Sequence, residues 1–159
     1  MFKILGGGLI IFASFLYSRM KAEEIKKRIE FADGLLAGFV ALEEQVCGLL
    51  MPLERAFLYA AYPSGAAAEV FGSAADGAGG ACERFSSALG EKSEFAESIL
   101  PYINGITALE EEERRCAFSL IRTRLEEKRK LLSEELFALG RLYGAVGIPI
   151  GVLIVILLY

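Results

Sequence analysis

The feature that most constrains the fold of this chain is the pair of uncharged, apolar runs at its two ends. The first run, ILGGGLIIFASFLY, covers residues 4–17, and the second, LYGAVGIPIGVLIVILLY, covers residues 142–159. Each run approaches the roughly 20 apolar residues that an α-helix needs to cross a bilayer. We therefore predict an N-terminal transmembrane segment at residues 1–18 and a C-terminal one at residues 144–159.

Each apolar run also has a second interpretation. The N-terminal run could be a cleavable signal peptide, but the residues before Arg19, FLYS, lack the small residues that a cleavage site needs. The C-terminal run could be a buried core helix, but it has no polar face. Pro149 is compatible with a membrane helix, where neighbouring groups can satisfy the carbonyl that it frees. We therefore favour uncleaved anchors at both ends.

The basic residues that flank the two runs predict the orientation of the chain. Lys and Arg residues are enriched on the cytoplasmic side of membrane segments. The middle of the chain, residues 19–143, is therefore expected in the cytoplasm, although Lys3 opposes this orientation slightly. The basic residues on which the expectation rests are Arg19, Lys21, Lys26, Lys27, Arg28, Lys128, Arg129, Lys130 and Arg141.

The middle of the chain has the composition and periodicity of α-helices. No stretch alternates as a strand would, and good helix formers dominate. We predict an all-α fold, a membrane-anchored helical bundle of about six helices whose long first and last helices continue into the transmembrane segments. The expected helices cover about residues 22–48, 52–61 and 66–75, one that ends at Gly90, one capped by Ser93, and one that begins with a capping box at Thr107-Ala-Leu-Glu110.

The residue types give little support for an enzyme. The chain has no His, which removes the commonest general base and the commonest zinc ligand. The acidic cluster from Glu110 to Glu113 is better explained by the dipole at a helix start. The three cysteines have no CxxC spacing, and we expect them to be buried, reduced thiols. We therefore predict a protein without catalytic residues, metal or cofactor.

Three groups of charged residues are candidate contacts with a partner or with lipid. The basic cluster near the first apolar run could touch anionic headgroups or could be an ordinary solvated helix face, paired for example from Glu24 to Arg28. The second group is an acidic pair at the end of the first expected helix. The third is an arginine pair on the last helix, for which a solvated face is the favoured interpretation. The candidates are Lys26, Lys27, Arg28, Glu43, Glu44, Arg122 and Arg124.

Three stretches together resemble the stage III sporulation protein AB family of endospore-forming bacteria. KILGGGLIIFASFLYSRM at residues 3–20 is similar to the family's short apolar opening. LEEQVCGLLMPLERAF at residues 42–57 is similar to its acidic helix end followed by a Pro-Leu helix start. The C-terminal stretch, residues 114–159, resembles its long charged helix, Tyr/Gly junction and aliphatic tail. The chain departs from the family pattern at Met51 and Gln45, where Thr and an acidic residue are usual.

The resemblance implies a function. It implies a non-enzymatic platform component of the channel complex between mother cell and forespore, anchored in the mother-cell membrane around the forespore. The helical domain would dock a secretion-type ATPase and other stage III membrane proteins, as in the platform proteins of type II secretion and type IV pilus systems. Two alternatives remain, a membrane-bound sensor or regulator that binds a soluble effector and a secreted helical domain. The partner surface and the oligomeric state, including a homo-oligomer, stay open.

Overall fold

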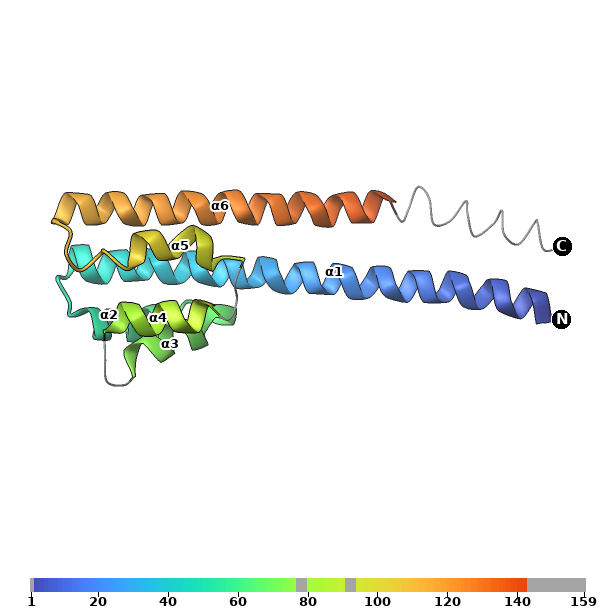
Figure 1. The fold of residues 1–159 in the computed structure, drawn as a ribbon, viewed down its shortest axis with the longest axis horizontal. Helices are drawn as coiled ribbons and strands as arrows, with labels where there is room; N and C mark the ends of the chain where they lie inside the picture. The colour runs from blue at the N-terminus through green and yellow to red at the C-terminus, as the bar shows by residue number, and fades with distance from the viewer. Residues whose placement is uncertain (1, 77–79, 91–93, 143–159) are drawn as a thin grey trace. The chain divides into compact units, whose positions relative to one another are not determined.

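The computed structural model describes residues 2–76, 80–90 and 94–142, with the side chains of residues 16–76, 80–90 and 94–141. Within these residues the chain forms six α-helices and no strand, which confirms the predicted all-α fold (Figure 1). The helices are α1 (Phe2–Glu43), α2 (Leu53–Ala61), α3 (Ala68–Ala75), α4 (Ala81–Gly90), α5 (Ala96–Ile103) and α6 (Glu111–Leu142). A π-helical turn, η1 (Glu44–Gly48), and a 3-10 turn, η2 (Gly65–Ala67), complete the elements.

The chain divides into two compact units, of which one contains both ends. The first unit comprises residues 1–29 and 131–159, and the second comprises residues 30–130. Helix α1 is continuous from Phe2, so the predicted continuity of the apolar opening with the first long helix is confirmed. The predicted C-terminal transmembrane segment, residues 144–159, lies outside the described residues. In the parts of the chain that are described, no helix combines the length and apolar character needed to cross a membrane.

Four phenylalanine rings form the centre of the second unit. Phe39 of α1 contacts Phe71 of α3 and Phe85 of α4 edge to face, with centroids 5.5 and 5.6 Å apart. Phe57 of α2 lies 5.3 Å from Phe85, and Phe71 lies 5.1 Å from Phe85. None of the four side chains is more than 2% exposed. We call them the Phe cluster, and because each ring comes from a different helix, the cluster joins α1, α2, α3 and α4.

Two glycines on α1 let the chain between α2 and α3 pack directly against the helix backbone. Gly34 lies against the backbone carbonyl of Ser64, and Gly38 lies against the Ser64 hydroxyl and the Phe71 ring. Ser64 is fully buried, its hydroxyl donates to the carbonyl of Ala60, and its carbonyl accepts from the Ala67 N–H at 2.8 Å. A Cβ at either glycine would overlap these atoms. Small residues at this spacing therefore determine how closely α1 and the turn at Ser64 approach.

The end of α1 differs from the prediction of one α-helix over residues 22–48. The α-helix stops at Glu43, and the last turn widens into the π-helix η1. The N–H of Leu49 then donates to the carbonyl of Glu44 at 3.1 Å, and the N–H of Met51 donates to that of Gln45 at 3.0 Å. Leu50 between them has φ 50°, in the left-handed region that favours glycine. The chain reverses here before Pro52, which stands immediately before α2.

We expect Leu50→Gly to raise the free energy of unfolding by about 1 kcal/mol. The left-handed conformation costs a residue with a Cβ about 1–2 kcal/mol, and glycine removes that cost while adding some entropy to the unfolded chain. The Leu50 side chain is 73% exposed, so little packing is lost. Urea denaturation of the two chains would measure the difference. Leu49→Gly is the matched control, because Leu49 is 64% exposed with φ −102° and should not be stabilised.

The start of α6 also differs from the prediction. The capping box expected at Thr107-Ala-Leu-Glu110 does not form, and the helix begins at Glu111. One of the two bonds of a capping box forms three residues later, where the backbone N–H of Glu110 donates to the Glu113 carboxylate at 3.4 Å. The residues before it lie in turns instead, in which the N–H of Ile106 donates to the carbonyl of Ile103 and that of Ala108 to the carbonyl of Gly105, and Ile106 is buried. The guanidinium of Arg114 donates to the carbonyls of Ile106 and Leu109 and fixes this loop.

The remaining helices agree closely with the predicted ones. Helix α4 buries Cys82, Phe85 and Leu89 and ends at Gly90, as expected. The expected Ser93 cap lies outside the described residues, and α5 begins at Ala96. Of the side chains expected to be buried near α5, Phe95, Ile99 and Ile103 are buried and Leu100 is half-buried.

Candidate functional site

The candidate contact residues occur on three elements, α1, η1 and α6. Lys26, Lys27 and Arg28 lie on the part of α1 that belongs to the first unit. Glu43 ends α1, Glu44 begins η1, and the arginine pair, Arg122 and Arg124, lies on α6, all within the second unit. The candidates therefore form two separate groups, one basic and one of mixed charge, and each is described within its own unit.

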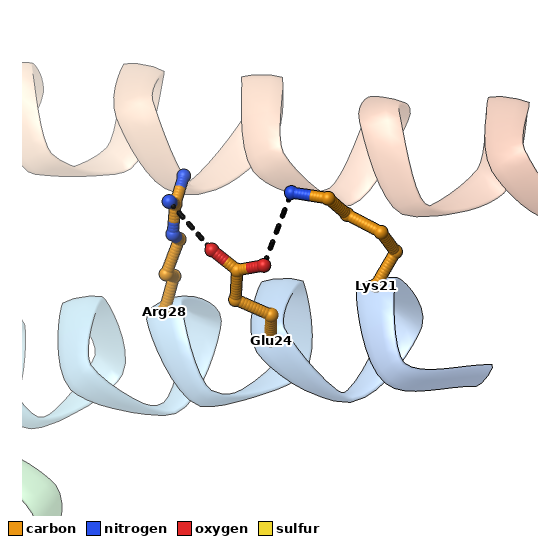
Figure 2. A network of polar contacts seen from close by, with 3 residues as sticks. All are labelled: Lys21, Glu24 and Arg28. Atoms are coloured by element: carbon orange, nitrogen blue, oxygen red, sulfur yellow. Dashed lines mark hydrogen bonds and ion pairs between the residues drawn. The ribbon is translucent and has the colours of Figure 1, made fainter. Parts of the chain in front are cut away.

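Arg28 belongs to a local ion-pair network on α1. Glu24 accepts from Lys21 at 3.1 Å and from Arg28 at 2.9 Å, and Figure 2 shows the carboxylate between the two cations. The hydrogen bond from Lys21 and the two positive charges hold the pKa of Glu24 below its usual value. All three side chains are 43–47% exposed. The predicted pair from Glu24 to Arg28 is thus confirmed, and Arg28 is partly neutralised within its own helix.

Lys26 and Lys27 differ from Arg28 because their charges are not neutralised nearby. Both side chains are exposed, and neither forms an ion pair with another residue in the described part of the chain. They directly follow Ile25, which is 2% exposed, so the helix has one buried side and one basic side here. These two lysines are therefore the members of the basic cluster that retain a full charge for an anionic contact.

Glu43 and Arg122 join α1 to α6 inside the second unit. Their charged groups lie 3.5 Å apart, with the Glu43 side chain 24% exposed and that of Arg122 39% exposed. Asp33 and Arg129 form a second ion pair between the same helices. Asp33 pairs with Arg129 and Glu43 pairs with Arg122, so residue numbers decrease along α6 as they increase along α1. The two helices therefore run antiparallel in this unit. These two candidates therefore pair with each other across the two helices, while both side chains stay partly exposed.

Glu44 and Arg124 are the more accessible members of the mixed group. Arg124 pairs with Glu127 one turn later on α6 at 3.3 Å, and both side chains are more than half exposed. Such an exposed local pair contributes well under 1 kcal/mol and leaves Arg124 able to exchange partners. Glu44 is exposed and makes no ion pair with any other described residue. Glu44 is therefore the acidic candidate that is free to meet a basic partner.

The cysteines confirm the prediction at two positions and contradict it at the third. Cys47 and Cys82 are buried, and burial raises the pKa of both thiols. The carbonyl of Cys47 accepts from Arg115 of α6 at 3.4 Å, which links η1 to α6 beside the two ion pairs between α1 and α6. Cys116 was expected on an apolar face but is exposed. The reason is the register of α6, whose buried side passes through Ala117, Ile121 and Leu125.

We expect a thiol reagent to modify Cys116 first and the other two cysteines only on unfolding. The thiolate is the reactive form, and a raised pKa leaves less of it at neutral pH, while burial also blocks access. Mass spectrometry after brief maleimide treatment at pH 7, native and in urea, would give one and three adducts respectively. The Cys116→Ser chain should take up none in the native state. Native modification of that chain would contradict the burial of Cys47 and Cys82.

Within the described residues, no group of three or more His, Cys, Asp or Glu side chains could hold a metal ion. No buried side-chain nitrogen or oxygen in this part of the chain lacks a hydrogen-bond partner. Among the candidate residues, the accessible charges are Lys26 and Lys27 on α1, Glu44 on η1 and Arg124 on α6.

Comparison with protein families decides the relationship. The family model described as stage III sporulation protein AB matches residues 3–159, almost the entire chain. The chain belongs to the stage III sporulation protein AB family. The match spans both the helical middle and the two apolar ends, so the resemblance seen in the sequence is confirmed. The search of curated proteins and the search of solved structures returned no match.

Membership of the stage III sporulation protein AB family makes this a sporulation protein. Two functional details in this family member were not predicted from its sequence. The ion pair between Asp33 and Arg129 joins residues far apart in the chain, so no local sequence pattern predicts it. The exposure of Leu58 and Tyr59 on α2 and of Tyr62 directly after it was also not predicted.

Proposed function

We propose that this protein is a membrane-anchored, non-enzymatic platform component of the sporulation channel complex between mother cell and forespore. The observation that carries the proposal is α1, which continues without a break from the apolar opening into the exposed basic cluster at Lys26 and Lys27. In this proposal the apolar opening of α1 lies in the bilayer, and the basic turns that follow it lie at the headgroups. The apolar ends, residues 1–18 and 144–159, are the proposed anchors.

The helical middle, residues 19–143, is proposed to lie in the cytoplasm of the mother cell. There it would dock a secretion-type ATPase and other stage III membrane proteins. The accessible charges Glu44 and Arg124 are the proposed contacts of the second unit. A partner that contacts Glu43 or Arg122 would compete with the ion pair between them. The alternative is a membrane-bound regulator whose bundle binds a soluble effector.

Thiol accessibility in intact cells tests the location. Cys116 is exposed and provides a native reporter, and Ser87 on α4 is an exposed position for a second one in a Cys116→Ser chain. We expect a membrane-impermeant maleimide to modify neither position until the cells are lysed. Modification in intact cells would place the helical middle outside the cytoplasm and rule out a cytoplasmic ATPase as its partner. Copurification of a secretion-type ATPase with the full chain would then support the platform function. Its absence would favour the regulator that binds a soluble effector.

Vesicle binding tests the basic cluster. We expect Lys26→Glu combined with Lys27→Glu to weaken attachment of the full chain to vesicles containing anionic lipid, because each lysine near such a surface contributes about 1 kcal/mol. Flotation with anionic and with neutral vesicles would measure it. Arg124→Glu is the matched control, since it reverses a charge on α6 that the proposal does not place at the membrane. Equal flotation of all three chains would exclude the lipid contact.

A further inference from the structure

Two neighbouring leucines are exposed on the turn that joins η1 to α2. Leu49 and Leu50 are 64% and 73% exposed, and Met51 beside them is half-buried. Leu50 also has the left-handed φ of 50°, which a glycine would adopt at lower cost. The turn therefore holds an apolar side chain in water on a backbone that does not favour leucine. Strained residues of this kind cluster at functional sites, so this turn is a candidate contact.

Acidic side chains from two elements surround this turn. The N–H of Leu49 donates to the carbonyl of Glu44 at 3.1 Å, so the leucines lie beside η1. The guanidinium of Arg115 donates to the carbonyl of Cys47 at 3.4 Å and pairs with Glu111 at 2.9 Å. The start of α6 therefore lies against η1, and Figure 1 shows the end of α1 and the start of α6 at the same end of the second unit.

This end of the second unit carries the net charge of the whole chain. We call residues 44–54 and 110–115 the acidic end. Its charged residues are six acidic ones, Glu44, Glu54, Glu110, Glu111, Glu112 and Glu113, and two basic ones, Arg114 and Arg115, a net charge of −4. The whole chain also has a net charge of −4, so the rest of it is neutral. All six acidic side chains are exposed, whereas both arginines donate to backbone carbonyls.

The charge of the acidic end excludes several occupants. Nucleic acids and membranes that contain anionic lipid are negatively charged, so this surface repels both. A second copy bound through the same surface would place two net charges of −4 face to face, and like charges oppose association. The occupant that the charge favours is therefore a protein surface rich in Lys and Arg.

We propose that the acidic end docks a protein whose apolar pocket, surrounded by Lys and Arg side chains, receives Leu49 and Leu50. The buried centre of an interface is apolar and excludes water, while charges at its rim orient the partner. The proposal rests on the proposed function, because it specifies the chemistry of the partner that the helical middle docks. Within it, Glu44 belongs to the rim.

Leu50 distinguishes docking from a structural role. Glycine at this position is expected to stabilise the free chain, because it relieves the left-handed conformation. The same change removes an apolar side chain from the proposed contact, so it should weaken docking. A residue that serves only the fold would not show these two effects with opposite signs.

Photocrosslinking of the full chain in sporulating cells tests the contact. Gly48 is exposed, and a Cβ there would meet only the Glu44 side chain, at 4.0 Å, so p-benzoylphenylalanine at this position leaves both leucines in place. We expect a protein adduct from position 48 and none from Ser87, an exposed position on α4. Mass spectrometry should locate the adduct in a surface rich in Lys and Arg. The proposal is overturned by the absence of an adduct specific to position 48, or by an adduct with an acidic surface or a second copy.

Substitutions in this photoreactive chain test the apolar centre. Leu49→Ala and Leu50→Gly should each lower the adduct yield about tenfold, because burial of a leucine side chain contributes at least that much to affinity. Leu131→Ala is the matched control, since Leu131 of α6 is 62% exposed and lies outside the acidic end. Urea denaturation should show that the Leu50→Gly chain is at least as stable as its parent. Yields that neither leucine substitution lowers would contradict the proposed contact.

Neutralisation of carboxylates tests the basic rim of the partner. Glu44→Gln combined with Glu112→Gln should lower the adduct yield about fivefold, since each exposed pair contributes up to about half of that effect. Glu126→Gln combined with Glu135→Gln removes two exposed carboxylates elsewhere on α6 and should leave the yield unchanged. Equal yields from the two double variants would exclude a basic rim.

The identity of the adduct separates this proposal from the proposed function. An adduct with a secretion-type ATPase supports both. An adduct with a different basic protein supports docking at the acidic end and counts against the ATPase as the partner. Copurification of the ATPase without an adduct from position 48 supports the platform function and overturns docking at the acidic end.

Discussion

Replacement of Gly34 by alanine is expected to lower the free energy of unfolding by about 3 kcal/mol. The added Cβ would overlap the backbone carbonyl of Ser64 and would approach the N atom of Ala67 to 3.0 Å. Overpacking of a filled core costs about 1–3 kcal/mol, and the upper end applies here because backbone atoms cannot move aside as a flexible side chain can. Chemical denaturation of the purified chains would measure the change.

Gly72→Ala is the matched control for this effect. Gly72 lies within α3, and a Cβ there would meet nothing within 4 Å. Alanine is the better helix former, so this variant should be more stable than the parent by about 0.5–1 kcal/mol. The two Gly→Ala changes should therefore have opposite signs. Equal effects would show that α1 does not approach Ser64 as closely as described.

The second large effect is expected for Phe71→Ala, which should lower the free energy of unfolding by about 3–5 kcal/mol. Phe71 is fully buried and contacts the other three members of the Phe cluster, Phe39, Phe57 and Phe85. Its removal leaves a cavity at the point where four helices meet, and helices held from several sides cannot collapse into it. Thermal and urea denaturation would both report the loss.

Phe137→Ala provides the comparison for a surface ring. Phe137 of α6 is 64% exposed, and the guanidinium of Arg141 stacks over its ring at 4.8 Å. An exposed cation–π contact contributes about 0.5–1 kcal/mol, so the change in stability should stay within that range. A loss at Phe137 as large as that at Phe71 would contradict the assignment of the core to the Phe cluster. A small loss at Phe71 would do the same.

Both predictions concern the contacts that hold α2 in place. Gly34 and Gly38 pack against Ser64, which follows α2, and the Phe cluster holds the buried side of α2. The position of α2 within the second unit therefore depends on both sets of contacts.

The sequence by itself determined the helical class, most helix boundaries and the family. Helix periodicity, the Pro52 start and the Gly90 end are local signals, and local signals specify local structure. The same logic predicted the Glu24–Arg28 pair, whose members are one helical turn apart. The long apolar runs and the three stretches that resemble the family likewise depend only on residue order. They could therefore be recognised without knowledge of the fold.

Only the tertiary structure decided which charges are free and where helices are interrupted. Glu43 and Arg122 looked like accessible candidates until the antiparallel packing of α1 and α6 paired them. Helix α6 starts at Glu111 after turns that bury Ile106, and Cys116 is exposed because the helix turns the side with Ala117, Ile121 and Leu125 inward. Gly34 gained its importance from Ser64, thirty positions later in the chain. These features depend on packing between residues far apart in sequence, and local sequence patterns do not predict such packing.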